Sequence, residues 1–253
     1  MNLGYSMDLG KPIGKGATAD VYAWGSGQVL KLFKKKFPKS HIINEVNAAK
    51  LAYKNGIPTP KVEWELQEIN NLFGICFERI DGISLVNYVI ANPNLQSETV
   101  TKFTELHSEI HKIKCEGLLS QRRLLQDKLA IVDQKKKYPY GRIINKLDSL
   151  PEGNQLCHGD FTAENIIVKD KKLFITDWSL GCCGNPIADF ARTIIVHKMA
   201  NISISNYIEG YLAINNLKWN DIEPWLPTVA VSLVYDLPKL KRKLINLSLC
   251  RRL

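Results

Sequence analysis

The chain has 253 residues, of which 45% are apolar, and its formal charge at pH 7 is +9. This length and composition are typical of a globular protein with one large core or two modest lobes. No apolar run is long enough to span a bilayer, and the N-terminus lacks the basic-then-apolar pattern of a signal peptide, so we expect a cytoplasmic protein with no membrane partner.

The first expected element is a glycine-rich hairpin over residues 13–22, in which Gly14 and Gly16 precede an alternating strand. Glycines let backbone N–H groups approach the phosphates of a nucleotide closely. The same glycines would also suit an ordinary β-turn, and the segment lacks the Gly-Lys-Ser/Thr arrangement of a P-loop. The hairpin alone therefore leaves phosphate binding and a purely structural role open.

An almost wholly apolar strand is expected at residues 28–33, interrupted by Lys31. A lysine in such a strand usually faces solvent, but the preceding glycine loop favours a contact between Lys31 and the α- and β-phosphates of a nucleotide. A helix from about residue 40 to 56 follows, with Glu45 beside its apolar stripe. We expect Glu45 to pair with Lys31, and a solvent-facing glutamate is the alternative.

Two further strands, at residues 62–66 and 72–78, complete an antiparallel small lobe. The remainder of the chain is expected to be mainly helical. The predicted fold is therefore α+β and bilobal. Residues 1–80 would form a nucleotide-binding lobe, and residues 81–253 would form a catalytic and substrate-binding lobe.

At the segment 77–82, Phe-Glu-Arg-Ile-Asp-Gly, the sequence changes from an apolar strand to mainly charged residues and a glycine. We expect this segment to be the hinge between the two lobes. In such hinges the base of a nucleotide bonds to the main chain. The Glu78 carbonyl and the Ile80 N–H are therefore the candidate groups, and Phe77 would lie behind the base.

His107 and His111 stand four residues apart in an expected helix over residues 98–113, which is a spacing that suits two metal ligands. Leu106 and Ile110 are interleaved with them, and no third ligand is evident in the sequence. We interpret the pair as part of helix packing or as exposed, and not as a metal site.

The most informative stretch runs from residue 157 to 178. Asn165 follows Asp160 by five positions, and an expected hairpin places Asp177 beside Asn165. A kinase site needs one carboxylate to orient the attacking hydroxyl, and an amide and a second carboxylate to hold Mg²⁺ on the nucleotide. We therefore assign Asp160 to the hydroxyl and Asn165 and Asp177 to the metal, although such residues are also common in turns.

With these segments the chain resembles the aminoglycoside phosphotransferase and choline kinase family of small-molecule kinases, over about residues 10–195. The likeness rests on His-Gly-Asp at 158–160 with Asn165 after it, and on Asp-Trp at 177–178 in place of Asp-Phe-Gly. It implies a protein-kinase-like fold. The histidine of the motif would brace the catalytic loop, and Asp189 would buttress it.

The resemblance implies transfer of the γ-phosphate of ATP, or of GTP, to a hydroxyl of a small molecule. Asp160 would align that hydroxyl and accept its proton late, because phosphoryl transfer is largely dissociative. The chain has no Ala-Pro-Glu segment and little room between Asp177 and Asp189 for a peptide-docking loop, so a protein kinase is a less favoured alternative. A catalytically inactive nucleotide-binding regulator is another, and no protein partner is implied.

The identity of the acceptor stays open at this stage. An aminoglycoside would favour clustered acids, but the C-terminal region mixes acids with bases. Its aromatic residues could stack on a sugar or surround a quaternary ammonium, although they are more typical of a core. The acids are Glu209, Asp221, Glu223 and Asp236, and the aromatic residues are Tyr207, Tyr211, Trp219, Trp225 and Tyr235.

Six cysteines are scattered along the chain, with neither the spacing of a zinc site nor the density of a disulfide scaffold. We therefore expect reduced thiols, with Cys182 and Cys183 as two small residues packed in a loop. Three short basic runs, at 34–36, 135–137 and 241–243, lie far apart without a base-reading motif. A solvated surface is preferred over nucleic-acid binding for these runs.

Overall fold

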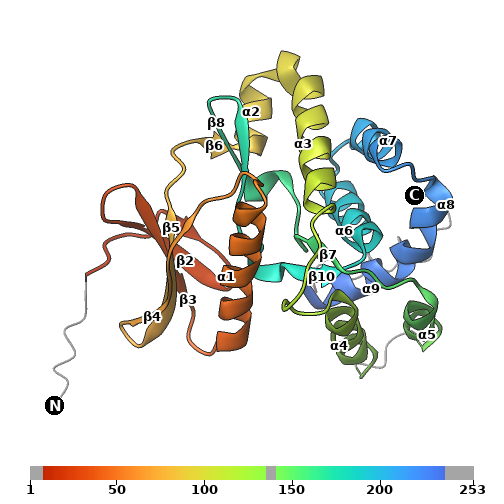
Figure 1. Ribbon diagram of the computed structural model, residues 1–253, viewed down its shortest axis with the longest axis horizontal. Helices are drawn as coiled ribbons and strands as arrows, with labels where there is room; N and C mark the ends of the chain where they lie inside the picture. Colours follow the sequence, from red (N-terminus) through yellow and green to blue (C-terminus); the bar gives the residue numbers. More distant parts are fainter. Residues whose placement is uncertain (1–7, 135–140, 237–253) are drawn as a thin grey trace.

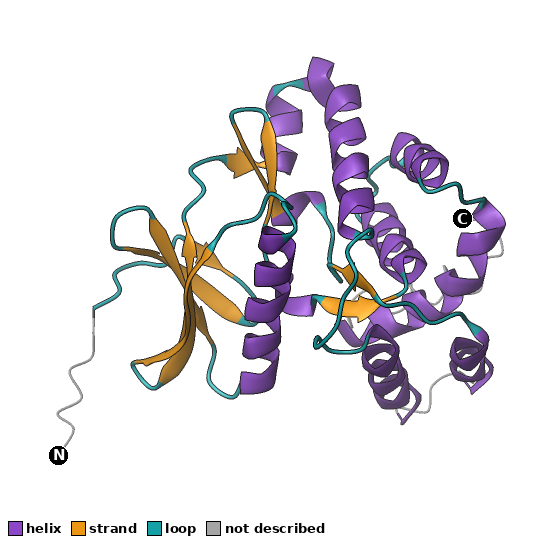
Figure 2. Ribbon diagram, viewed as in Figure 1, coloured by secondary structure: helices purple, strands orange, loops and turns teal. Residues whose placement is uncertain are grey.

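The computed structural model describes residues 8–134 and 141–236, and its fold is α+β and bilobal, as expected (Figure 1). An antiparallel sheet and one long helix form the N-terminal side of the molecule, and the other helices gather on the opposite side (Figure 2). None of the helices in the described ranges is long and apolar enough to cross a membrane.

The N-terminal sheet has five strands in the order β1-β2-β3-β5-β4, and each neighbouring pair is antiparallel. The strand expected at 62–66 continues to Ile69, because left-handed Asn70 and Asn71 reverse the chain in two residues. The elements of this side are β1 (Gly14–Lys15), β2 (Ala19–Trp24), β3 (Gln28–Phe33), α1 (Lys39–Lys54), β4 (Val62–Ile69) and β5 (Leu72–Glu78).

Helix α1 contributes to two hydrophobic cores. Ile42 and Val46 are buried against the sheet together with Phe33. Further along the helix, Ala48 and Ala52 belong to the large core of the helical side. The middle of the helix is therefore fixed between the sheet and the core of the helical side.

Two small sheets connect the sides. Strand β6 follows the hinge and pairs with β8, and β8 pairs with β9 in the predicted hairpin, whose turn lies at Asp170 and Lys171. The second sheet pairs β7 with β10. The strands are β6 (Ile83–Ser84), β7 (Gln155–Cys157), β8 (Ile166–Lys169), β9 (Lys172–Ile175) and β10 (Cys182–Gly184).

Helix α6 is the central helix of the C-terminal side. It begins at Pro186, a residue suited to the first helical position, and the Asn185 side chain caps it by accepting the Ile187 N–H at 2.9 Å. Phe190 and Ile194 are completely buried. The helices and short 3-10 turns are α2 (Leu85–Ala91), η1 (Pro93–Leu95), α3 (Gln96–Ile110), α4 (Gln121–Gln134), α5 (Gly141–Ser149), η2 (Ala163–Asn165), η3 (Trp178–Leu180), α6 (Pro186–Met199), α7 (Ser205–Ile214), α8 (Trp219–Ile222), η4 (Glu223–Trp225) and α9 (Leu226–Asp236).

The expectation of reduced thiols is wrong for two cysteines, because Cys115 and Cys183 form a disulfide. They are 68 residues apart in the sequence. The chain after α3 runs beside β10, where the Cys183 N–H donates to the Leu119 carbonyl at 2.9 Å, and this path brings the two sulfurs together. The free and buried cysteines of the described chain are Cys76, Cys157 and Cys182, and Cys250 lies outside the described residues.

The basic run at 34–36 is exposed, as a solvated surface requires. The runs at 135–137 and 241–243 lie outside the described residues.

Candidate active site

The loop after β7 is anchored to α6 through Asp189. This buried carboxylate accepts the backbone N–H of His158 at 2.8 Å and that of Gly159 at 2.9 Å. Gly159 has φ +80°, and a Cβ there would lie 2.2 Å from the Leu180 carbonyl oxygen. A glycine is therefore required at this position, and the expected buttressing of the loop by Asp189 is confirmed.

His158 braces the same loop from within. Its ring is fully buried, its Nδ1 accepts the Asp160 N–H at 3.2 Å, and its Nε2 lies 3.1 Å from the Thr176 carbonyl. A carbonyl can only accept, so Nε2 carries the proton. Burial lowers the pKa of His158, which keeps the ring neutral. The ring therefore holds the loop in place, and its one N–H is bonded to the Thr176 carbonyl.

Asn165 orients the carboxylate of Asp160. Its Nδ2 donates to the Asp160 carbonyl at 2.9 Å and to Asp160 Oδ2 at 3.0 Å. The Asp160 side chain remains 36% exposed and is therefore accessible from solvent. The Thr176 N–H donates to the Asn165 carbonyl at 2.8 Å, which places Asp177 next to Asn165 along the hairpin, as expected.

Lys31 lies between two carboxylates. Its Nζ is 2.6 Å from Glu45 Oε1 and 2.7 Å from Asp177 Oδ1. The predicted ion pair with Glu45 is therefore confirmed, whereas the contact with Asp177 was not predicted from the sequence. Glu45 is buried, and the Asp177 side chain is 44% exposed. The lysine thus connects the sheet, α1 and the catalytic hairpin.

The ionisation of these three groups follows from burial and mutual attraction. Burial alone would lower the pKa of Lys31, but Glu45 and Asp177 outweigh it and the pKa is raised. Burial alone would raise the pKa of Asp177, but the Lys31 ammonium lowers it to about 2. Burial raises the pKa of Glu45, whose Oε2 is buried with no hydrogen-bond partner in the described chain. At neutral pH Lys31 is therefore a cation and Asp177 an anion.

The glycine hairpin is closed by its own backbone. The Gly16 N–H donates to the Ala19 carbonyl at 2.9 Å, and the Gly16 carbonyl accepts from Lys34 Nζ at 2.6 Å. A Cβ on Gly16 would lie 3.0 Å from that Ala19 oxygen, whereas one on Gly14 would make an ordinary contact of 3.6 Å. The local requirement for glycine is therefore stronger at Gly16, and phosphate binding by the hairpin stays a prediction.

The hinge begins where β5 ends. The Glu78 N–H donates to the Lys61 carbonyl at 2.8 Å, and the Arg79 N–H donates to the Gly27 carbonyl at 2.9 Å. Ile80 is buried, and its N–H has no backbone acceptor within the described ranges. Base binding by this N–H at the hinge stays a prediction.

An ion cluster that the sequence analysis missed adjoins Asp160. Arg192 Nη2 lies 3.4 Å from Asp160 Oδ1, and its Nη1 lies 2.7 Å from Asp236 Oδ2, which also pairs with Lys128 Nζ at 2.9 Å. The signal for Arg192 was its position three residues after Asp189, which puts both on one face of a helix. The sequence marks Asp236 only as one of several acids in the C-terminal region. The cluster joins α4, α6 and α9 at the Asp160 carboxylate.

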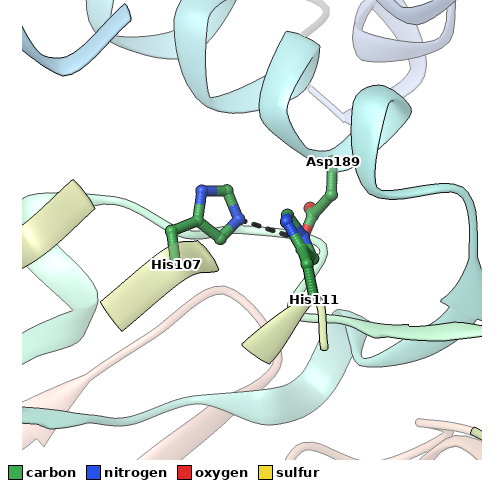
Figure 3. Close-up of side chains that lie close together, drawn as sticks. All are labelled: His107, His111 and Asp189. Carbon is green, nitrogen blue, oxygen red and sulfur yellow. Dashed lines mark hydrogen bonds and ion pairs between the residues drawn. The ribbon is translucent and has the colours of Figure 1, made fainter. Parts of the chain in front are cut away.

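His107 and His111 are buried and point at the carboxylate of Asp189 (Figure 3). Their Nε2 atoms lie 3.3 and 3.2 Å from Asp189 Oδ2. Their Nδ1 atoms lie 2.7 and 2.6 Å from the hydroxyls of Tyr207 and Tyr211, respectively. Helix packing, one of the two sequence interpretations, is confirmed. A third group with a ligand atom, the carboxylate of Asp189, lies beside the two histidines and was not recognised from the sequence.

The three groups have the composition of a metal site, because their ligand atoms all lie within 4.8 Å of one another. Their hydrogen bonds account for the same geometry without a metal. An ionised carboxylate can only accept, so each Nε2–H donates to Asp189, and each Nδ1 lies within hydrogen-bond distance of a tyrosine hydroxyl. Burial alone would raise the pKa of Asp189, but the hydrogen bonds from His107 and His111 hold it well below its usual range. We interpret the cluster as a support for the carboxylate that anchors the catalytic loop.

The aromatic residues of the C-terminal side mostly belong to the core. Tyr207, Tyr211 and Trp225 are buried, Trp219 is partly buried, and Tyr235 is 48% exposed. The first three are therefore not available as an open stacking surface for a sugar or an ammonium group.

A small antiparallel lobe, a mainly helical lobe and a carboxylate loop held between them define a kinase-like small-molecule phosphotransferase that acts on hydroxyl groups. The chain belongs to the phosphotransferase enzyme family (APH), whose sequence model matches residues 10–220. No curated protein matches the chain.

Solved structures share the fold at low sequence identity. A choline/ethanolamine kinase family protein from Mesorhizobium loti is 17% identical, with a TM-score of 0.66 over 96% of this chain and 86% of that one. A thermostable mutant of aminoglycoside phosphotransferase APH(4)-Ia, in complex with AMP-PNP and hygromycin B, is 12% identical and has a TM-score of 0.67. The match covers 99% of this chain and 93% of that one. The streptomycin-ATP complex of APH(2")-IIa is 14% identical and has a TM-score of 0.62. The match covers 93% of this chain and 90% of that one.

Proposed function

We propose that this enzyme transfers the γ-phosphate of ATP, or of GTP, to a hydroxyl group of a small molecule. Two contacts carry the proposal. Asp160 is partly exposed and is oriented by Asn165, and Asp177, which follows the hairpin that begins after Asn165, is paired with Lys31. Two similar structures contain a nucleotide together with an aminoglycoside, which supports a nucleotide as the phosphate donor.

Asp160 is the proposed catalytic residue. It would accept a hydrogen bond from the acceptor hydroxyl, align its oxygen with the γ-phosphorus, and take the proton late in the transfer. A strong base is not needed for this role, because a loose transition state has little bonding to the attacking oxygen and the hydroxyl proton can leave late.

Lys31 is proposed to bind the α- and β-phosphates of the nucleotide, with Glu45 holding the ammonium in place. Gly14 and Gly16 would cover the phosphates from the hairpin. The Gly16 N–H is bonded to the Ala19 carbonyl, so a contact from this particular N–H to a phosphate would require that bond to break.

Asn165 and Asp177 fit a magnesium ion. Mg²⁺ prefers oxygen ligands and usually keeps several waters, so an amide oxygen and a carboxylate are sufficient. The Asn165 side chain uses its Nδ2 for Asp160, which leaves Oδ1 for a metal, and Asp177 stays ionised because its pKa is about 2. The ion would neutralise charge on the phosphates.

The hinge is proposed to bind the base through the Glu78 carbonyl and the Ile80 N–H. In this proposal residues 1–80 bind the nucleotide, and residues 81–253 carry the catalytic residue and bind the acceptor. Nucleic acid, membrane and protein partners are not part of the proposal.

The cytoplasm is the proposed location, because the phosphate donor is a nucleoside triphosphate. The Cys115–Cys183 disulfide is the observation that counts against this location, since cytoplasmic thiols are generally kept reduced. Thiol labelling of the enzyme inside intact cells, before lysis, measures whether the bond is present there.

The test is nucleotide-dependent phosphate transfer by the purified chain to aminoglycosides, choline, ethanolamine, sugars, neutral alcohols and a generic peptide. The proposal expects a phosphorylated small molecule, and Asp160→Ala should abolish turnover while largely sparing ATP binding measured by calorimetry. Normal turnover of the Asp160→Ala variant, or phosphorylation of the peptide alone, would refute the assignment.

A further inference from the structure

A cavity of about 570 Å³ lies between α2, α3, the catalytic turn η2 and the segment from the end of α6 into α7. Its volume is within the range of small-molecule binding sites. The helices that form it lie at the same end of the helical side (Figure 1). Nothing in the mechanism described above uses this space.

The walls of the cavity are uncharged. Among the described residues that line it there is no aspartate, glutamate, lysine or arginine. Leu85 and Val89 of α2 and Val100 and Phe103 of α3 supply much of the apolar surface. A charged ligand would therefore lose its hydration in this space without gaining an ionic partner.

The mouth of the cavity carries exposed apolar side chains. Ile90 of α2 is 73% exposed, and Ile202, which follows α6, is 45% exposed, and both line the cavity. Large apolar side chains that stay in water beside a cavity are typical of a binding site for an apolar ligand. The apolar surface thus continues from the interior of the cavity to its rim.

His197 supplies a polar group in one wall. Its side chain is buried, and its Nδ1 lies 2.9 Å from the Thr193 carbonyl, so Nδ1 must donate. Burial lowers the pKa of His197, which leaves a neutral ring whose Nε2 is a hydrogen-bond acceptor. Such a nitrogen suits a hydroxyl or an amide of a neutral molecule.

The cavity borders the catalytic loop. Ala163 lines it and shares the three-residue turn η2 with Asn165, whose Nδ2 donates to Asp160 Oδ2 at 3.0 Å. Phe103 in the cavity wall packs against Phe161, the residue after Asp160, with ring centroids 4.4 Å apart. The cavity wall is therefore continuous with the turn that carries Asn165 and with the residue that follows Asp160.

We propose that the phosphate acceptor is an uncharged alcohol whose apolar body lies in this cavity and whose hydroxyl reaches Asp160. The proposal rests on the proposed function. In the step, the hydroxyl oxygen forms a bond to the γ-phosphorus while the bond from that phosphorus to the β-phosphate oxygen breaks. The hydroxyl proton passes to the Asp160 carboxylate, and the products are a phosphate monoester and a nucleoside diphosphate.

The first experiment measures ADP release and phosphate ester formation with linear alcohols from 1-butanol to 1-decanol, beside gentamicin and choline. Each added methylene should raise kcat/KM about fourfold until the cavity is full, because that is the gain from burying one methylene. Gentamicin and choline should be poor acceptors. A preference for gentamicin or choline, or a kcat/KM independent of chain length, would overturn the proposal.

The second experiment places a charge at the rim. Ile90→Glu and Ile202→Glu change exposed residues, so the fold should be retained, and each should lower kcat/KM for 1-octanol at least tenfold with the KM for ATP unchanged. Ile214→Glu is the matched control, because Ile214 is 46% exposed and lies outside the cavity. Equal effects of all three substitutions would contradict the assignment of the cavity.

The third experiment separates the cavity from the chemistry. The neutral fluorophore N-phenyl-1-naphthylamine should bind the Asp160→Asn enzyme, and 1-octanol should displace it. Binding should weaken in the Ile90→Glu variant and persist in the Ile214→Glu variant. If no acceptor is phosphorylated, the proposed function fails. If the fluorophore does not bind, or binds Ile90→Glu as well as the parent, the cavity proposal fails whatever the transfer assay shows.

Discussion

The guanidinium of Arg192 lies 3.4 Å from a carboxylate oxygen of Asp160, the proposed catalytic residue. The same guanidinium is anchored by Asp236 at 2.7 Å, so helix α9 is connected to the catalytic carboxylate through one side chain. Asn165 holds the other carboxylate oxygen of Asp160 at 3.0 Å. The two contacts together orient the carboxylate from both sides.

Replacing Arg192 with methionine should lower kcat about 10- to 100-fold, because small errors in the position of a catalytic group are costly. The KM for ATP should not change, since Arg192 does not contact the groups assigned to the nucleotide. Asp236 keeps Lys128 as a partner, which limits the loss of stability. Steady-state kinetics with varied ATP measure both parameters.

The matched control for this change is Arg123→Met. The Arg123 side chain is 74% exposed and pairs with Asp127 on the surface of α4, where ion pairs contribute little. Its kcat should equal that of the parent. A normal kcat in Arg192→Met would show that Asn165 alone is sufficient to orient Asp160.

Replacing Glu45 with glutamine should raise the KM for ATP about tenfold. Glutamine keeps the shape of the side chain but removes the charge that holds Lys31, whose remaining partner is then Asp177. Lys31 would move toward Asp177 and compete with magnesium for its carboxylate. Measuring the KM for ATP over a range of magnesium concentrations checks this, because excess magnesium should recover part of the loss.

Glu65→Gln is the control for this change, since Glu65 is exposed and pairs with Lys50 at the surface. It should leave the KM for ATP unchanged. If Glu45→Gln behaves in the same way, the buried pair has a purely structural role.

The catalytic loop was readable from the sequence because its groups lie within about 20 residues and have a characteristic spacing. Asp160, Asn165 and Asp177 are placed by one short turn and one hairpin, so local geometry is sufficient. The ion pair of Lys31 and Glu45 could also be predicted from the sequence, because the strand and the helix that carry them follow one another in the chain.

The remaining contacts depend on how distant helices pack, which local patterns do not encode. His107 meets Tyr207 and His111 meets Tyr211 across 100 residues of sequence, because α3 packs against α7. Arg192 reaches Asp236 because α6 packs against α9.

Reducing the disulfide should destabilise the protein by up to about 4 kcal/mol. A bond between Cys115 and Cys183 closes a long loop in the unfolded chain, and the entropy lost there scales with the loop length. Urea unfolding with and without dithiothreitol measures the difference in free energy. Cys183→Ser should unfold at a lower urea concentration and should be insensitive to dithiothreitol. Identical curves for the oxidised and reduced parent would contradict this prediction.

The stability of the fold should decrease as the pH falls below about 6.5, because buried histidines must be protonated on unfolding. Burial, together with the neighbouring His111, lowers the pKa of His107 to about 3, although Asp189 opposes the shift. A histidine whose pKa is lower in the folded state stabilises the fold fully above its unfolded value, and this contribution is lost as the pH falls toward the folded value. His158 and His197 shift in the same direction.

His107→Asn should therefore reduce the slope of unfolding free energy against pH between pH 6 and 4 by about 1.4 kcal/mol per pH unit, the value for one proton. The slope is the decisive measurement, because the loss of the contact with Tyr207 lowers the stability at every pH. Urea unfolding at half-unit pH intervals supplies it. A parent slope retained in His107→Asn would mean that His107 does not take up a proton when the protein unfolds.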